Sequence, residues 1–324
     1  MASRKDIIQK QLQYVIRETD FDFLGEKYSG KVRDNYASSS CRYLVTTDRL
    51  SCFDKVVACI PYKGQVLNQL ALYWFRQTTD IIRNHLIESP DPNVMAVQDC
   101  KILPVEIVLR SYLAGSAWRD YESGKDVSGI TLPKGLQRYE KLPETILTPS
   151  TKAEKGQHDL PISEEEVLSS GLVNKENWAK VKSTALRLFE YGQSMAKKQG
   201  LLLVDTKYEF GLVDGEIILA DEVHTLDSSR YWVEESYQEK FEAGESPVML
   251  DKEPTRQWLL DQGYMGDGPI PEFTQEHLAM ISEHYIQAYE WITGGTFEPV
   301  VADPIPRISN NLREFDSLMQ GAST

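Results

Sequence analysis

Three charged residues alternate along residues 201–211, where a β-strand is predicted. Asp205, Lys207 and Glu209 fall on one face of that strand, because side chains at every second position project to the same side. The next apolar segment ends at Asp221, so a hairpin would bring a further carboxylate close. Carboxylate oxygens from adjacent strands suit Mg²⁺ and leave coordination positions open for phosphate and water. The pattern predicts a metal site at Glu209 and Asp221, with a solvated strand face as the alternative.

The length of the hairpin loop decides whether these carboxylates meet. A two-residue turn pairs Tyr208 with Asp221 and directs Asp221 to the face opposite the other charges. A three-residue loop at 213–215 places Lys207 across from Asp221 and gathers the charged residues on one face. Gly215 can take the left-handed position that such a loop requires. We therefore predict the three-residue loop.

Basic residues in GEKYSGKVRDNY, residues 25–36, suit a phosphate group. Gly30 allows close approach of the backbone, and Lys31 and Arg33 alternate to the same side of a strand. The segment matches neither of the common glycine-rich phosphate loops, so an ordinary hairpin with exposed basic residues is the alternative.

A second anion site is predicted in PVEIVLRSYLAGSAW, residues 104–118. An apolar strand ends at Arg110, and a turn leads to Ser116 at the start of a helix. A guanidinium, a hydroxyl and the backbone N–H groups of a helix start can together bind an anion.

Two polar loops hold further candidates. They are residues 148–159, with Lys152, His158 and Asp159, and residues 221–232, with His224, Asp227 and Arg230. A capped polar turn is the alternative interpretation of the second loop. A lone histidine in a loop such as the first is more often structural or solvated than catalytic.

The overall charge excludes a polyanion as the main partner. The chain has 324 residues, with 35 Lys and Arg against 49 Asp and Glu, and a formal net charge of −14. Nucleic-acid binding draws most of its affinity from lysine and arginine on phosphates, and this sequence has no long basic block. A small phosphorylated ligand is compatible, because a few basic residues in one cleft can hold it.

The sequence also predicts no membrane span and no secretory signal. No apolar run approaches the ~20 residues that cross a bilayer, and charges interrupt the first 18 residues. The four cysteines lack metal-ligand spacing, so we expect reduced thiols in a cytoplasmic protein.

The elements expected around these candidates give an α+β fold. Strands without regular βαβ alternation favour this class over a doubly wound sheet. The polar tail after about Asn310 is predicted to be loosely held. Strands are predicted within 21–60, at 86–88, 94–97 and 105–110 and in the hairpin. Helices are predicted at 64–83, from Ala117, from a capping box at Ser163, and at 175–199, 253–262 and 273–292. The helix at 175–199 is expected to have Asn174 as its N-cap and Gly200 as its left-handed C-terminal cap.

Seven segments, taken together and in order, resemble the SAICAR synthetase (phosphoribosylaminoimidazole-succinocarboxamide synthase) family of de novo purine biosynthesis. The resemblance extends from about Phe21 to Leu260. It implies an ATP-dependent ligation of L-aspartate to the carboxylate of carboxyaminoimidazole ribotide (CAIR) through an acyl phosphate, giving SAICAR, ADP and phosphate. The segments are GKVRDNY, TDRLSCFD, PVEIVLRSYLAGSAW, TPSTKAEKGQHD, DTKYEFG, DEVHTLDSSRYW and LDKEPTRQWL.

The resemblance also implies a domain arrangement. An N-terminal β-rich ATP-binding subdomain is expected at 1–104, a larger α+β subdomain for substrate and metal at 105–262, and a C-terminal helical extension packed on the core at 263–324. The ATP cleft is expected between the first two. ATP and Mg²⁺ are the implied cofactors, and the implied partners are small-molecule substrates, with no nucleic acid or membrane. Both a monomer and a homo-oligomer are compatible.

Roles carry over to matching positions only as the resemblance implies them. Gly30, Lys31 and Arg33 match the ATP phosphate loop, and Glu209 and Asp221 match the Mg²⁺ ligands. Lys207 would sit between ATP and the ribotide carboxylate, and with Asp227 and Arg230 it forms the expected catalytic set. The expected substrate-binding set is Arg110, Ser116, Asp227, Arg230 and Arg256, the last near the 5′-phosphate, with Asp48, Arg49, Ser51, Lys152 and Asp159 near the substrates without defined roles.

A few positions depart from the family pattern, and two other functions stay open. Cys52, Ser111 and Leu226 differ from the usual residues, which affects local loop geometry rather than an assigned charge. The aspartate pocket and the roles of His158 and His224 are not defined. The alternatives are a small-molecule kinase on a related scaffold, which stops at phosphoryl transfer, and a nucleotide-binding regulator without turnover.

Overall fold

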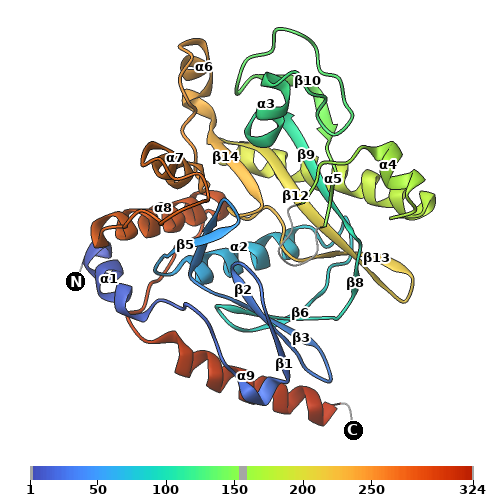
Figure 1. Cartoon of the computed structure of the whole chain (residues 1–324). Coiled ribbons are helices and arrows are strands. Elements are labelled where there is room, and N and C mark those ends of the chain that lie inside the picture. The colour runs from blue at the N-terminus through green and yellow to red at the C-terminus, as the bar shows by residue number, and fades with distance from the viewer. Residues whose placement is uncertain (1–2, 153–158, 323–324) are drawn as a thin grey trace. The chain divides into compact units, whose positions relative to one another are not determined.

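A computed structural model describes residues 3–152 and 159–322 of the chain and divides it into two compact units. The mixture of helices and antiparallel sheets confirms the predicted α+β class (Figure 1). These units are defined by packing alone and carry no information about ligands. The predicted ATP-binding and substrate-binding domains therefore stay a prediction. Unit 1 contains Met1–Tyr73, Leu86–Asp99 and Asp251–Thr324, and unit 2 contains Trp74–His85 and Cys100–Leu250.

Unit 1 is built around an antiparallel five-stranded sheet with the order β1-β2-β3-β7-β6. Tyr43, Val45 and Val94 are fully buried in the apolar cluster on one face of this sheet. A separate two-stranded sheet joins β4 and β5. The strands are β1 (Glu26–Ser29), β2 (Arg33–Ala37), β3 (Arg42–Thr46), β4 (Arg49–Cys52), β5 (Lys55–Cys59), β6 (Leu86–Asp91) and β7 (Val94–Val97).

The helices of unit 1 come mostly from the two ends of the chain. The helix predicted at 64–83 ends at Gln77, where the hydroxyl of Thr78 donates to the carbonyl of Trp74. The helices are α1 (Arg4–Gln11), α2 (Lys63–Gln77), which continues into unit 2, α7 (Glu253–Asp261), α8 (Gln275–Thr293) and α9 (Pro304–Ala322), with short 3₁₀ turns at Leu12–Tyr14 and Asp22–Leu24.

The prediction of a loosely held tail after Asn310 was wrong. The tail forms most of α9, and Ile308 and Leu312 of this helix are fully buried in the apolar cluster of the unit 1 sheet. The guanidinium of Arg307 also binds Asp91 on β6, with an Nε–Oδ2 distance of 2.9 Å. The spacing of four residues between two apolar positions in a polar segment was the signal for this amphipathic helix.

Unit 2 contains a second antiparallel sheet, in which the long strand β12 is central. The main order is β10-β9-β12-β13; β8 and β14 also pair with β12, and β11 pairs with β9. Helix α5 packs against β12 and β9 (Figure 1). The elements are β8 (Lys101–Ile102), β9 (Val105–Tyr112), α3 (Gly115–Glu122), β10 (Lys141–Leu147), β11 (Ser150–Thr151), α4 (Glu164–Ser169), α5 (Lys175–Lys198), β12 (Leu201–Val213), β13 (Glu216–Ala220), β14 (Ser229–Val233) and α6 (Glu234–Glu242).

Helix caps in unit 2 lie where the sequence predicts them. Ser163 and Glu166 form a reciprocal capping box at the start of α4. The side chain of Asn174 accepts a hydrogen bond from the backbone N–H of Asn177 at 2.8 Å, which caps α5. Gly200 follows this helix with a φ of 71° and ends it in the left-handed conformation.

The predicted three-residue hairpin loop was wrong. Val213 pairs with Glu216, so the turn between β12 and β13 has two residues, Asp214 and Gly215. Both have positive φ values, 51° and 83°, as a turn that follows the twist of the two strands requires. The ladder ends at the pair Glu209 and Ala220, one residue before Asp221.

No helix in the described part of the chain is long and apolar enough to span a membrane. Cys41, Cys52 and Cys59 are buried, and together with the partly buried Cys100 they are free thiols. The prediction of reduced cysteines is thus confirmed for the described residues.

His224 is a fully buried structural residue of unit 2. Its Nε2 atom lies 2.5 Å from the hydroxyl of Tyr208, and its ring packs edge-on against Trp74. Gly192 on α5 leaves the space for this ring, because a Cβ atom there would overlap the imidazole. Burial lowers the pKa of His224 to about 3, so the ring is neutral in the folded protein at neutral pH.

The charge state of His224 makes stability fall with acidification. In the unfolded chain the imidazole takes up a proton as the pH falls below about 6.5, whereas the folded protein resists this until about pH 3. We expect His224 alone to remove about 2 kcal/mol from the free energy of unfolding between pH 7 and pH 5. Urea unfolding of wild type and His224→Asn at both pH values measures this slope, which should be smaller in the variant. His277→Asn, a change at a partly exposed ring, serves as the control, and equal slopes in all three proteins would contradict the assignment.

Candidate active site

One face of the unit 2 sheet carries the charged residues that the sequence singled out. On β12, Asp205 pairs with Arg110 of β9 and with Arg230 of β14, so three strands contribute to one row of side chains. Val204 and Tyr208 take the opposite face and are fully buried. The predicted alternation along β12 is therefore confirmed, and the charged face is not an ordinary solvated surface, since Asp205 is only 3 % exposed.

Asp205 binds two arginines with a single carboxylate oxygen. Its Oδ2 atom lies 3.0 Å from Nη1 of Arg110 and 2.7 Å from Nη1 of Arg230. Arg110 also donates to the hydroxyls of Thr148 at 2.9 Å and Ser116 at 3.1 Å. Burial lowers the pKa of Arg110, and the Asp205 carboxylate opposes that shift. The structure thus brings together the predicted anion-site residues Arg110, Ser116 and Arg230.

Gly115 explains how Arg230 reaches this cluster. Gly115 begins α3 with a φ of 60°, which few other residues adopt. A Cβ atom at this position would lie 2.7 Å from the guanidinium carbon of Arg230, well inside van der Waals contact. The absence of a side chain therefore lets the guanidinium lie against the start of the helix, beside Ser116.

Lys207 lies among carboxylates at the next position along the face. Its Nζ atom is 2.6 Å from Oε1 of Glu106 on β9 and 3.9 Å from Oε1 of Glu209. Burial favours loss of the proton, but attraction by Glu106, Glu209 and Asp221 outweighs it and raises the pKa of Lys207 well above its usual value. Lys207 therefore keeps its proton at neutral pH.

Glu209 is a strongly perturbed acid of the face. Burial and repulsion from Asp221 raise its pKa to about 7, and Lys207 and Lys152 oppose the rise. Lys152 also forms an ion pair with the Glu209 carboxylate. A carboxylate that is both buried and repelled by a second one is stabilised by a bound cation.

Asp221 approaches Glu209 in spite of the corrected register. It follows β13 with a φ of 64°, and this left-handed backbone turns the chain out of the strand. Its charge acts on both Glu209 and Lys207. Glu209 and Asp221 are the pair that could hold a metal ion, and among the described residues no group of three or more His, Cys, Asp and Glu is arranged to do so.

In unit 1, the segment from Gly30 to Arg33 forms the tip between β1 and β2. The N–H of Gly30 donates to the carbonyl of Arg33 at 2.8 Å and closes the turn. Lys31 is exposed and forms an ion pair with Asp54 on the turn between β4 and β5. An exposed pair of this kind is weak, so the lysine is available to a phosphate. The predicted phosphate role of this tip stays a prediction.

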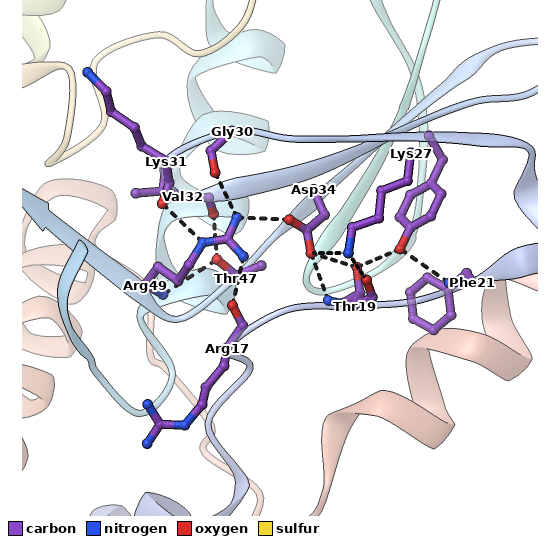
Figure 2. Close-up of polar contacts among 11 residues, drawn as sticks. Arg17, Thr19, Phe21, Lys27, Gly30, Lys31, Val32, Asp34, Thr47 and Arg49 are labelled. Atoms are coloured by element: carbon purple, nitrogen blue, oxygen red, sulfur yellow. Dashed lines mark hydrogen bonds and ion pairs between the residues drawn. The ribbon is translucent and has the colours of Figure 1, made fainter. Parts of the chain in front are cut away.

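Asp48 and Arg49, predicted near the substrates, are both buried in unit 1. The carboxylate of Asp48 accepts hydrogen bonds from the N–H groups of Ile16 at 2.7 Å and Gly64 at 2.9 Å. Burial raises the pKa of Asp48 to about 6. Figure 2 shows the guanidinium of Arg49 surrounded by backbone carbonyls and by Asp34. Arg49 holds the backbone of the Gly30 tip in place, whereas Asp48 joins Ile16 to the start of α2 at Gly64.

The other predicted residues have simpler surroundings. Arg256 on α7 packs its guanidinium over the ring of Phe53, 4.8 Å from the centroid. Ser51 and Asp227 are partly buried, and Asp159 is exposed. His158 lies outside the described residues. The roles predicted for these residues stay predictions.

Sequence reasoning missed the residues that complete the charged face. Asp205 was noted only as one of three alternating charges, although it binds both arginines. Glu106 contacts Lys207, and Thr148 contacts Arg110. No sequence pattern indicated a role for either residue. Glu106 and Arg110 are an even number of residues apart, so the sequence alone places them on the same face of one strand. Only the strand pairing shows that this strand lies beside β12.

Comparisons with known proteins agree on one family. The sequence pattern of the family described as SAICAR synthetase matches residues 26–269. A phosphoribosylaminoimidazole-succinocarboxamide synthase of Legionella pneumophila (strain Lens) is 46% identical over 293 residues, which cover 88% of this chain and 93% of the relative. A synthase of the same name from Bacteroides fragilis is 46% identical over 308 residues, 93% of this chain and 98% of the relative.

Solved structures give the same result. A SAICAR synthase of Saccharomyces cerevisiae in complex with SAICAR superposes with a TM-score of 0.77 at 32% identity, covering 87% of this chain and 99% of that one. A SAICAR synthetase in complex with ADP superposes with a TM-score of 0.66 at 26% identity, covering 84% of this chain and 100% of that one.

The bridge made by Asp205 generates a stability prediction. Asp205→Asn keeps the shape of the side chain but removes the charge that neutralises Arg110 and Arg230, so a buried and a partly buried guanidinium group repel each other. We expect the free energy of unfolding to fall by about 3 kcal/mol, measured by urea unfolding at pH 7. Glu216→Gln, at an exposed position on the tip of the same hairpin, is the control and should change stability little. Equal stability of Asp205→Asn and wild type would refute the bridge.

Proposed function

The chain belongs to the SAICAR synthetase family, and on that premise we propose that it joins L-aspartate to the carboxylate of CAIR. ATP is consumed, and SAICAR, ADP and phosphate are formed in de novo purine biosynthesis. The observation that carries this proposal is the match of the family pattern to residues 26–269, a span that includes the whole charged face. One similar structure contains SAICAR and another contains ADP, and both molecules are products of the proposed reaction. We also propose a cytoplasmic location, in keeping with the free cysteines of the described chain.

The reaction needs activation of a carboxylate, because a carboxylate is a poor electrophile. The γ-phosphoryl group of ATP moves to the CAIR carboxylate, which forms an acyl phosphate and releases ADP. The amine of aspartate then attacks the acyl carbon, a C–N bond forms, and phosphate leaves. Such transfers depend mainly on alignment and on neutralisation of charge rather than on a protein nucleophile.

The charged face of unit 2 supplies these requirements for the ribotide. We assign Arg110, Ser116 and Arg230 to anionic and hydroxyl groups of CAIR, with Asp227 as a neighbouring polar contact. Asp205 fixes the two guanidinium groups relative to each other. Lys207 keeps its proton, so it can stabilise negative charge on the carboxylate throughout phosphoryl transfer.

Glu209 and Asp221 fit a Mg²⁺ ion. Mg²⁺ prefers oxygen ligands, and it is commonly held by one or two carboxylates together with substrate phosphates. The raised pKa of Glu209 arises partly from repulsion by Asp221, and a divalent cation removes this repulsion. When bound, the ion would neutralise charge on the ATP phosphates. Lys152, which pairs with Glu209, would then be released toward an anionic ligand.

In unit 1 we assign the Gly30 tip to the phosphates of ATP. Lys31 is exposed, Arg33 is partly exposed, and Gly30 has no side chain, so ligand oxygens can approach the backbone. Arg256 stays a proposed partner of the ribotide 5′-phosphate on the resemblance of its segment alone.

An assay of coupled turnover tests the proposed function. The protein is incubated with ATP, Mg²⁺, CAIR and L-aspartate, and ADP and SAICAR are followed in parallel. We expect equal amounts of both products and little ADP when aspartate is omitted. ADP release that does not depend on aspartate and yields no SAICAR would indicate a kinase, and ATP binding without turnover would indicate a regulator.

The metal ligands are tested by removing each carboxylate. Glu209→Ala and Asp221→Ala should lower kcat at least about 100-fold, because the metal no longer neutralises the transferred phosphoryl group. Circular dichroism should show that both variants remain folded. Glu216→Ala, at the exposed tip of the same hairpin, should keep wild-type kcat. Wild-type Mg²⁺-dependent turnover in both site variants would overturn the metal assignment.

A further inference from the structure

The side chain of Arg49 holds three separate parts of unit 1 together. Its Nε atom donates to the carbonyl of Lys31 at 3.0 Å and its Nη2 atom to the carbonyl of Gly30 at 3.0 Å. Its Nη1 atom donates to the carbonyl of Arg17 at 2.7 Å, and Nη2 also binds Oδ1 of Asp34 at 2.9 Å. Figure 2 shows these contacts converging on one guanidinium. Arg49 thus connects the Gly30 tip to β2 and to the segment before β1.

Asp34 gives this guanidinium a fixed counter-charge. The Asp34 side chain is completely buried, and its Oδ2 atom accepts from the backbone N–H of Thr19 at 2.7 Å and from the Thr19 hydroxyl at 3.0 Å. Burial alone would raise the pKa of Asp34, but hydrogen bonds from Arg49 and Thr19 outweigh it and lower the pKa. The Arg49 side chain is therefore neutralised and only 10 % exposed, so its charge is not offered to a ligand in solvent.

Thr47 binds the backbone carbonyl of the next residue of the tip, Val32. Its hydroxyl donates to the carbonyl of Val32 at 2.7 Å, and its N–H donates to the same carbonyl at 3.0 Å. The carbonyls of Gly30, Lys31 and Val32 are thus all bound by the segment 47–49. A trans peptide directs its N–H opposite to its C=O, so the amides that follow these carbonyls point away from Arg49 and Thr47.

We propose that Arg49 is a positioning residue that turns the carbonyl oxygens of the Gly30 tip inward and so presents the amides of the tip to the phosphates of ATP. This inference rests on the assignment of the tip to ATP in the proposed function. A carbonyl oxygen carries partial negative charge and repels phosphate, whereas successive N–H groups attract it. Holding the carbonyls in place therefore prepares the tip for an anion before ATP arrives, and the side chains of Lys31 and Arg33 add their charge.

Only the arginine geometry serves all these acceptors at once. A guanidinium has five N–H donors in a rigid plane, whereas a lysine ammonium is a compact charge with three donors. Arg49→Lys can keep the charge beside Asp34, but a single ammonium cannot also reach the carbonyls of Arg17, Gly30 and Lys31, which lie around the edge of the guanidinium. This substitution separates the positioning of the tip from the neutralisation of Asp34.

Steady-state kinetics and direct nucleotide titration of Arg49→Lys test the proposal. Arg307→Lys is the matched control, because Arg307 binds Asp91 and Asn93 in the same unit and contacts no residue of the tip in the described structure. We expect Arg49→Lys to weaken binding of an ATP analogue and raise KM for ATP at least about tenfold, with KM for CAIR within about twofold of wild type. Amide hydrogen exchange at residues 30–33 should speed up in this variant. Arg307→Lys should leave both KM values and that exchange unchanged.

Each other outcome counts against the proposal. Wild-type KM for ATP in folded Arg49→Lys would overturn it, as would an equal rise of KM for ATP in Arg307→Lys or an equal rise for CAIR and ATP. Should Arg49→Lys fail to fold, Thr47→Val decides: it removes one hydroxyl bond to the tip and should raise KM for ATP about threefold, and an unchanged value overturns the proposal. Failure of wild type to bind the ATP analogue would instead refute the proposed function, so the two failures are distinct.

Discussion

A buried carboxylate that neutralises arginine side chains is the interaction on which both units depend. A guanidinium cannot give up its proton in a protein, so an arginine taken out of water needs an opposite charge and acceptors for its remaining N–H groups. Unit 1 meets this requirement with Asp34 and Arg49, and unit 2 with Asp205, Arg110 and Arg230. The donors that the carboxylate does not use then hold other groups. In unit 1 these are the carbonyls of the Gly30 tip, and in unit 2 they are the hydroxyls of Ser116 and Thr148. Charge neutralisation and loop geometry therefore come from the same side chains.

The charges on the β12 face are only partly balanced by one another. Lys207 is surrounded by carboxylates and keeps its proton. Burial and repulsion from Asp221 disfavour the ionised form of Glu209 and so raise its pKa. A cation beside the two carboxylates and an anion beside the arginines would stabilise such a face, which agrees with the proposed binding of a metal nucleotide and of CAIR. The net charge of −14 is no obstacle to this chemistry, because the total charge describes the surface and the site depends on a few gathered residues.

Several elements were predictable because their signals are local. The capping box at Ser163, the N-cap at Asn174 and the alternation of Asp205, Lys207 and Glu209 depend on residues within one turn or one strand, and all three agree with the structure. The errors came from interactions across longer distances. The hairpin turn has two residues instead of three, and Asp221 still acts on Glu209 because a left-handed backbone follows the strand. The supposedly loose tail became α9, because the sheet of unit 1 offers an apolar face to Ile308 and Leu312.

The sequence by itself determined the family, the α+β class and the types of charged residue that the reaction needs, because ordered motifs and periodic patterns are properties of neighbouring residues. Only the tertiary structure decided what each charge does. Arg49 and Arg110 look alike in the sequence, because each is an arginine followed within two residues by a serine. Arg49 is enclosed by three carbonyls and Asp34, whereas Arg110 shares Asp205 with a second arginine beside Ser116. The physical reason is that burial and partner identity set the energy of a charge, and both depend on strands that are distant in the sequence.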